Sequence, residues 1–187
     1  MPTAPPTAPT RGTSSGGRRI ATIVVSVVVV MFAGGVVRNL LQPDYHVPES
    51  LPGMQRIQTV QTEDFERRMK AEGVSNNIDL EVAVYGSTMD PQVFLVLANG
   101  KAVEDTDQLF RGFLGGVESS GAMVDREAQT TGSHEGAEWR CVPVRASAVT
   151  ASVCMWREDA SVGMTLDLEP GEDLSGALLH AYDASHT

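Results

Sequence analysis

The stretch of sequence that decides the fold is WRCVPVRASAVTASVCMWREDASVGMTLDL, residues 139–168. In an antiparallel β-hairpin the numbers of directly opposed residues have a constant sum, so a register can be tested by arithmetic. A register that opposes Cys141 to Cys154 also opposes three other matching pairs: Trp139 with Trp156, Val142 with Val153, and Val144 with Ala151. A wrong register would not match cysteines, tryptophans and apolar residues at once. The sequence therefore predicts a hairpin of this register with its tip near residues 147 and 148.

A third strand is predicted at residues 162–168, where apolar residues alternate with small or polar ones. Opposing Met155 to Met164 places the apolar residues of this strand on the same face of the sheet as Val142 and Val144. That face is the predicted core side. Because side chains alternate between the two faces of a strand, both cysteines and both tryptophans fall on the opposite face.

This opposite face leaves two interpretations open for Trp139 and Trp156. The paired rings could form a flat platform that binds a partner protein, a peptide or a sugar-containing wall polymer. Alternatively, the first predicted helix, the second predicted helix or the linker covers the rings, because tryptophan is more often packed than displayed.

The two cysteines predict a structural disulfide. Cys141 and Cys154 come close enough for a bond in this register, and they lack the Cys-x-x-Cys spacing that redox-active pairs usually have. By closing a loop of roughly 14 residues, the bond would contribute about 3 kcal/mol to stability.

The remaining segments predict an α+β fold with one antiparallel sheet and two or three packed helices. The expected elements are helices at 62–72, from Asp105 onward and at 172–184, and strands at 78–85 and 93–98. The second helix contains three glycines, at Gly112, Gly115 and Gly116, each of which weakens a helix. We expect that they are present because a residue without a side chain allows the helix to pack closely against the sheet.

An uncharged apolar run of eighteen residues, IATIVVSVVVVMFAGGVV, occupies residues 20–37. As a helix it would span about 27 Å, and its insertion into a bilayer would be favourable by roughly 4 kcal/mol. Basic residues before the run place the N-terminus in the cytoplasm. The sequence predicts a single-pass plasma-membrane protein with a disordered cytoplasmic tail at 1–19, a transmembrane helix at 20–37, an extended linker at 38–60 and an extracytoplasmic domain at 61–187. The alternative is a signal peptide that is cleaved before Val36.

Charge is distributed unevenly along the chain, whose net charge is −10. All 24 acidic residues but only 10 of the 14 basic residues lie beyond Arg38, so residues 39–187 carry a net charge of −14. Such a surface repels phosphate backbones, which argues against nucleic acid as a partner. It suits cations or basic partners instead.

No catalytic, metal or cofactor site is predicted. The histidines are scattered, at His46, His134, His180 and His186. None lies at a metal-ligand spacing or beside a serine in a recognisable nucleophile turn. His134 and Glu135 lie in a loop rich in Gly, Ser and Thr, where solvated polar side chains are expected.

Several short motifs between residues 84 and 165 follow one another in a characteristic order. They are Val84-Tyr85-Gly86, Phe94-Leu95-Val96, Cys141, Val153-Cys154-Met155-Trp156 and Gly163. This order resembles a family of uncharacterised actinobacterial proteins that are anchored in the membrane by a single helix. In that family an acidic residue and a glycine follow the Cys-x-Trp motif, whereas here Arg157 and Glu158 intervene before Asp159. The resemblance implies a membrane anchor and a disulfide-containing outer domain without an assigned activity, so it transfers no catalytic residue.

The function expected from the sequence is a binding or scaffolding module at the cell envelope. The alternative is an envelope sensor or accessory subunit that acts through its membrane helix, and an unrecognised extracytoplasmic hydrolase is a third possibility. An exposed Trp139 and Trp156 face would favour the binding module. A deep pocket with convergent polar groups would favour the hydrolase, and a complex formed through the membrane helix would favour the accessory subunit.

Overall fold

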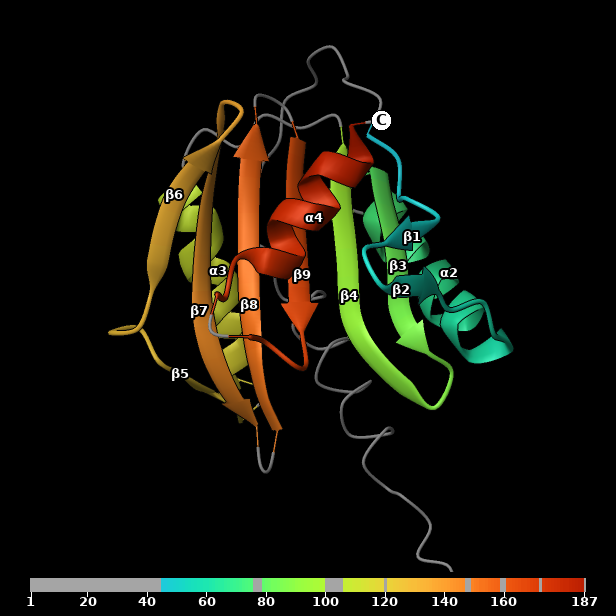
Figure 1. The fold of residues 1–187 in the computed structure, drawn as a ribbon, viewed down its shortest axis with the longest axis horizontal. Coiled ribbons are helices and arrows are strands. Elements are labelled where there is room, and N and C mark those ends of the chain that lie inside the picture. The colour runs from blue at the N-terminus through green and yellow to red at the C-terminus, as the bar shows by residue number, and fades with distance from the viewer. Residues whose placement is uncertain are drawn as a thin grey trace, which may run out of the picture.

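The computed structural model describes residues 45–75, 79–99, 106–119, 121–146, 149–158, 161–171 and 173–186 (Figure 1). The predicted tail at 1–19 and the predicted membrane helix at 20–37 lie outside the described residues, as does the predicted hairpin tip. Within the described part of the chain, no helix is both long and apolar enough to cross a membrane.

The described residues form one antiparallel sheet that is covered by helices on both faces (Figure 1). The strands are β1 (Ser50–Leu51), β2 (Met54–Arg56), β3 (Asp79–Ser87), β4 (Asp90–Asn99), β5 (Met123–Val124), β6 (Thr130–His134), β7 (Ala137–Ala146), β8 (Val149–Glu158) and β9 (Ser161–Asp167). The helices are α2 (Val60–Ser75), α3 (Thr106–Ser119) and α4 (Gly176–Ser185). The strand order is β1-β2-β3-β4-β9-β8-β7-β5, with β6 also paired to β7. The predicted α+β class with an antiparallel sheet is confirmed.

The central hairpin has the register that the sequence predicts. In the β7–β8 pair, Cys141 lies opposite Cys154, and the other pairs follow: Trp139 with Trp156, Val142 with Val153, and Val144 with Ala151. In the β8–β9 pair, Met155 lies opposite Met164. The register is fixed because a slip by one residue would turn every buried side chain to the other face.

Two apolar cores lie on the two faces of the sheet. The first core contains Val142 and Met155 of the sheet together with side chains of α2 and α3, such as Phe65 and Phe113. The second core contains the disulfide, Trp156 and side chains of α4 such as Leu178. The predicted division of the faces is therefore confirmed, and the second face is a core in its own right.

The packed domain begins earlier than the predicted residue 61. Tyr45 and Leu51 belong to the second core, Ile57 belongs to the first, and β2 pairs with β3. The prolines of this segment break its periodicity, and β1 and β2 are too short to show the alternation that reveals longer strands. Strands β1 and β2 and the buried Tyr45, Leu51 and Ile57 thus belong to the sheet and its cores, although they lie in the segment predicted as an extended linker.

The helices also differ from their predicted ends. Helix α2 is capped by Thr59, three residues before the predicted cap: Thr62 N donates to Thr59 Oγ1 over 3.2 Å, and Thr59 N donates to Thr62 Oγ1 over 2.8 Å. In α3, no atom of the described residues outside the helix's own backbone lies within 4 Å of the position that a Cβ would take at Gly112 or Gly115. The predicted close packing of those two glycines is therefore wrong, because both face away from the sheet.

Candidate functional site

The two tryptophans of the central hairpin do not form one exposed platform. Trp156 is 1% exposed, and the ring of Tyr182 of α4 packs edge-on against it at 5.8 Å. Its indole also lies across β9, because a Cβ built on Gly163 would lie 2.0 Å from it. Trp139 is half-buried and lies in the opposite direction across β6, where a Cβ on Gly132 would lie 2.4 Å from its ring. The last helix, which the sequence did not assign to this face, is the cover.

The two cysteines are bonded to each other, as predicted. Cys141 and Cys154 are both fully buried in the second core, and no cysteine is free in the described residues or elsewhere in a chain that has only these two. The buried bond joins the two central strands beneath α4. This position fits a structural bond rather than a reactive one.

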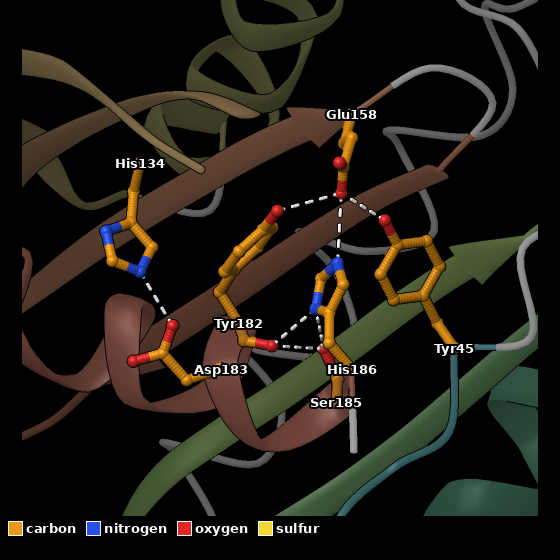
Figure 2. Close-up of polar contacts among 7 residues, drawn as sticks. All are labelled: Tyr45, His134, Glu158, Tyr182, Asp183, Ser185 and His186. Carbon is orange, nitrogen blue, oxygen red and sulfur yellow. Dashed lines mark hydrogen bonds and ion pairs between the residues drawn. The ribbon is translucent and has the colours of Figure 1, made fainter. Parts of the chain in front are cut away.

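Polar side chains from three separate segments meet at the carboxylate of Glu158, the last residue of β8 (Figure 2). The Oε2 atom of Glu158 accepts a hydrogen bond from the Tyr45 hydroxyl. It also accepts from the Tyr182 hydroxyl and from His186 Nε2, both over 2.9 Å. These contacts join the segment before β1, the end of β8 and the end of α4, so one carboxylate holds three parts of the fold together.

The hydrogen bonds around Glu158 keep its carboxyl group ionised. Burial alone would raise its pKa, but the hydrogen bonds from Tyr45, His186 and Tyr182 outweigh burial and lower the pKa. The pKa of Tyr182 is raised, first by burial and then by its hydrogen bond to Glu158. Near neutral pH Glu158 is thus an ionised carboxylate that accepts a hydrogen bond from the protonated hydroxyl of Tyr182.

The ring of His186 faces an acceptor on each side. Its Nδ1 lies 2.7 Å from the carbonyl oxygen of Tyr182, and its Nε2 lies 2.9 Å from Glu158 Oε2. A carbonyl oxygen and a carboxylate oxygen only accept hydrogen bonds, so each ring nitrogen has an acceptor within hydrogen-bond distance.

Ser185, His186 and Glu158 are the residue types of a hydrolase triad, but their geometry does not fit that role. Ser185 Oγ is 3.5 Å from His186 Nδ1 and donates instead to the carbonyl of Tyr182 over 2.8 Å. Because Nδ1 donates to the same carbonyl, it has no lone pair with which to accept the serine proton. Ser185 is also buried. The cluster anchors α4 and does not activate a nucleophile.

A second polar group lies beside this cluster, at the turn between β6 and β7. His134 Nε2 is 2.7 Å from Asp183 Oδ1 of α4, and the ring of His134 packs edge-on against Tyr182 at 5.5 Å (Figure 2). Glu135 follows in the turn, with φ at 50°. One ligand atom from each of His134, Glu135 and Asp183 lies within 4.8 Å of the others. The predicted solvation of His134 is therefore only partly right, since a helix carboxylate contacts it.

Sequence reasoning missed these groups because their members are far apart in the chain. Tyr45 is 113 residues from Glu158, and His134 is 49 residues from Asp183. Local spacing shows no relation between them. The one available signal was the pairing register, which places Glu158 on the same face as Trp156, where a lone carboxylate needs partners.

Comparisons of the chain with models of known protein families, with curated proteins and with solved structures give no match.

Proposed function

We propose that this chain is a membrane-anchored protein whose outer domain binds a partner at the cell envelope through the sheet edge around Trp139. One observation carries the proposal. Among the Phe, Tyr and Trp side chains of the described residues, only Trp139 is not buried. Tryptophan is enriched where one protein binds another, because a large flat ring gains much from losing its contact with water.

The chemistry near Trp139 favours a basic partner. The same sheet edge carries His134, and the adjacent turn and helix carry the exposed carboxylates of Glu135 and Asp183. An aromatic face beside carboxylates suits a lysine or arginine side chain, which can stack on the ring and pair with the acids. The net charge of −14 beyond Arg38 would attract such a partner and repel a polyanion.

The binding proposal is tested by crosslinking cells that express the full chain, preparing their envelopes and identifying the proteins that are captured with it. Trp139→Ala removes the half-buried ring, and Met89→Ala is the matched control, because Met89 is 94% exposed in the turn between β3 and β4. We expect a partner that is captured by the wild type and by Met89→Ala but not by Trp139→Ala. An identical set of captured proteins from all three would contradict the proposal, once circular dichroism shows that each variant is folded.

The anchored, extracytoplasmic location has its own test. In intact cells, added protease should degrade the C-terminal domain while a tag before residue 1 stays protected, and alkaline carbonate should leave the chain in the membrane. The bond between Cys141 and Cys154 should survive purification without reductant. A protected C-terminal domain, or two free thiols by mass spectrometry, would contradict the proposed extracytoplasmic location.

A further inference from the structure

We propose that His134, Glu135 and Asp183 form a binding site for a divalent transition-metal ion of the zinc type, between the β6–β7 turn and α4. The site has one imidazole nitrogen and two carboxylates, a mixed donor set that suits zinc. Calcium would need six to eight oxygen ligands, whereas the three residues of this site offer one nitrogen and two carboxylates.

The distances between the donor atoms fit a small ion after modest side-chain rotation. Ligand atoms about 2.0–2.1 Å from a tetrahedral zinc ion stand roughly 3.3 Å from one another. Here His134 Nε2 and Asp183 Oδ1 are 2.7 Å apart, and one ligand atom from each of the three residues lies within 4.8 Å of the others. Both carboxylates are exposed, so they can turn toward an ion without disturbing the core.

The backbone around the site holds the three donors in place. His134 ends β6 and pairs with Ala137 of β7, so only Glu135 and Gly136 form the turn between them. Glu135 has a φ of 50°, a conformation that Asn and Asp adopt more readily than a glutamate. On the other side, α4 is fixed by the hydrogen bonds of Tyr182 and His186 to Glu158. Donors carried by a tight hairpin and an anchored helix keep their spacing without a bound ion.

The local electrostatic field favours a cation. After burial and the contact with Glu158, the negative charges of Glu135 and Asp183 raise the pKa of the neighbouring Tyr182 further. Two carboxylates that face one histidine repel each other, and a divalent ion between them would remove that repulsion. Three protein ligands leave one coordination position open for water. Because the ion would occupy the carboxylates of Glu135 and Asp183, zinc and a basic partner would compete for them.

The test is a calorimetric titration of the purified, metal-free full chain in detergent with zinc chloride near pH 7, using an affinity tag without histidines. The three ligand variants are His134→Ala, Glu135→Gln and Asp183→Asn. The matched control is His180→Ala, which removes an exposed histidine of the same helix that lies outside the site. We expect one ion per chain for the wild type and the control, with affinity at least tenfold lower in each ligand variant.

Thermal unfolding separates a metal site from a simple ion pair. If the ion bridges the turn and the helix, saturating zinc raises the melting temperature of the wild type and of His180→Ala but not of His134→Ala, and a chelator reverses the shift. An ion pair alone would make His134→Ala less stable without any effect of zinc. No zinc binding by the wild type, or equal binding by all the ligand variants, would overturn the proposal.

Discussion

The residue Gly163 shows how closely the second core is packed. The indole of Trp156 covers it, and α4 holds the ring from the other side. A methyl group at this position would lie 2.0 Å from the ring, which is 1% exposed. We predict that Gly163→Ala lowers the free energy of unfolding by about 3 kcal/mol, because overpacking of a rigid core is costly. Urea denaturation followed by circular dichroism measures the change.

A glycine-to-alanine substitution in α3 serves as a control, because it is expected to raise the free energy of unfolding instead of lowering it. Gly112 is exposed, and apart from the backbone of α3 itself no atom in the described part of the chain lies within 4 Å of the place that an added methyl group would take. Because alanine favours helix over glycine, Gly112→Ala should raise the free energy of unfolding by about 1 kcal/mol. Equal effects at the two positions would show that the contact between Gly163 and Trp156 does not limit packing.

Thr165 of β9 is a buried polar residue whose replacement by an apolar residue of similar shape is expected to stabilise the fold. Its side chain is 2% exposed, and its hydroxyl has no hydrogen-bond partner among the described residues. Valine has nearly the same shape without the hydroxyl. We predict that Thr165→Val raises the free energy of unfolding by about 1–2 kcal/mol, since no buried polar group is left unpaired. Thr150→Val, at an exposed position of β8, should change it by less than about 0.5 kcal/mol in the same denaturation experiment.

Single residues also mark what could be predicted from the sequence. The pairs of the central hairpin were predictable because cysteines, tryptophans and apolar residues each constrained the same register. The partners of Glu158 were not, because hydrogen bonds between distant segments leave no periodic signal. The burial of Trp156 was one of two open interpretations, and only the position of α4 decided between them.

At the scale of elements, α4 is a short helix that depends on its anchors. The lowered pKa of Glu158 means that the folded chain binds this proton more weakly than the unfolded chain does, whose carboxyl has a pKa near 4.5. The stabilisation is therefore complete above about pH 4.5 and is lost as the pH falls through the lowered pKa. We predict that Glu158→Gln is less stable than the wild type at neutral pH and that this difference disappears in acid.

Melting temperatures of the two proteins between about pH 2 and pH 7 measure this effect. Glu127→Gln is the control, because Glu127 is exposed and takes no part in the cluster at Glu158. A constant difference between wild type and Glu158→Gln over the whole pH range would mean that the charge of Glu158 contributes nothing. A difference that grows in acid would contradict the sign of the pKa shift.

Element positions were easier to predict than element ends. Strands β3 and β4 lie where alternation and a continuous apolar run indicated them, and α3 begins next to the predicted Asp105. Helix α4 begins at Gly176, four residues after the predicted start, because residues 174 and 175 form a turn in which Ser175 N donates to Asp173 Oδ1 over 2.9 Å. Such local contacts between side chain and backbone compete with helix formation and are hard to recognise in sequence alone.

At the scale of the whole molecule, helices pack on both faces of the sheet, α4 on one face and α2 and α3 on the other (Figure 1). Deleting residues 173–187 would remove α4 and expose Trp156, the disulfide and the neighbouring apolar side chains of β4. We predict that the shortened chain has a lower melting temperature, a red-shifted tryptophan emission and increased binding of a hydrophobic dye, because a large apolar area would face water. Unchanged emission and melting would mean that α4 is not needed to cover this face.

The three-layer arrangement marks the limit of sequence prediction at this scale. The α+β class, the antiparallel central strands and the two faces followed from alternation and helical spacing. The second core did not, because it combines α4 with Tyr45 and Leu51 from a segment whose prolines suggested a linker. Elements that are distant in sequence and short in length are the ones that single-sequence patterns place least well.

The meeting of Tyr45 and His186 at one carboxylate has a mechanical consequence. Their rings are 4.3 Å apart, so the two ends of the described chain leave the domain at the same pole (Figure 1). Tension applied through the chain before Tyr45 would first load its hydrogen bond to Glu158, which is carried by β8 in the interior of the sheet. Only after that link yields would the force reach the edge strands β1 and β2, which can be peeled apart one hydrogen bond at a time. The hydrogen bond between Tyr45 and Glu158 would thus shield β1 and β2 from a pull on the chain before Tyr45.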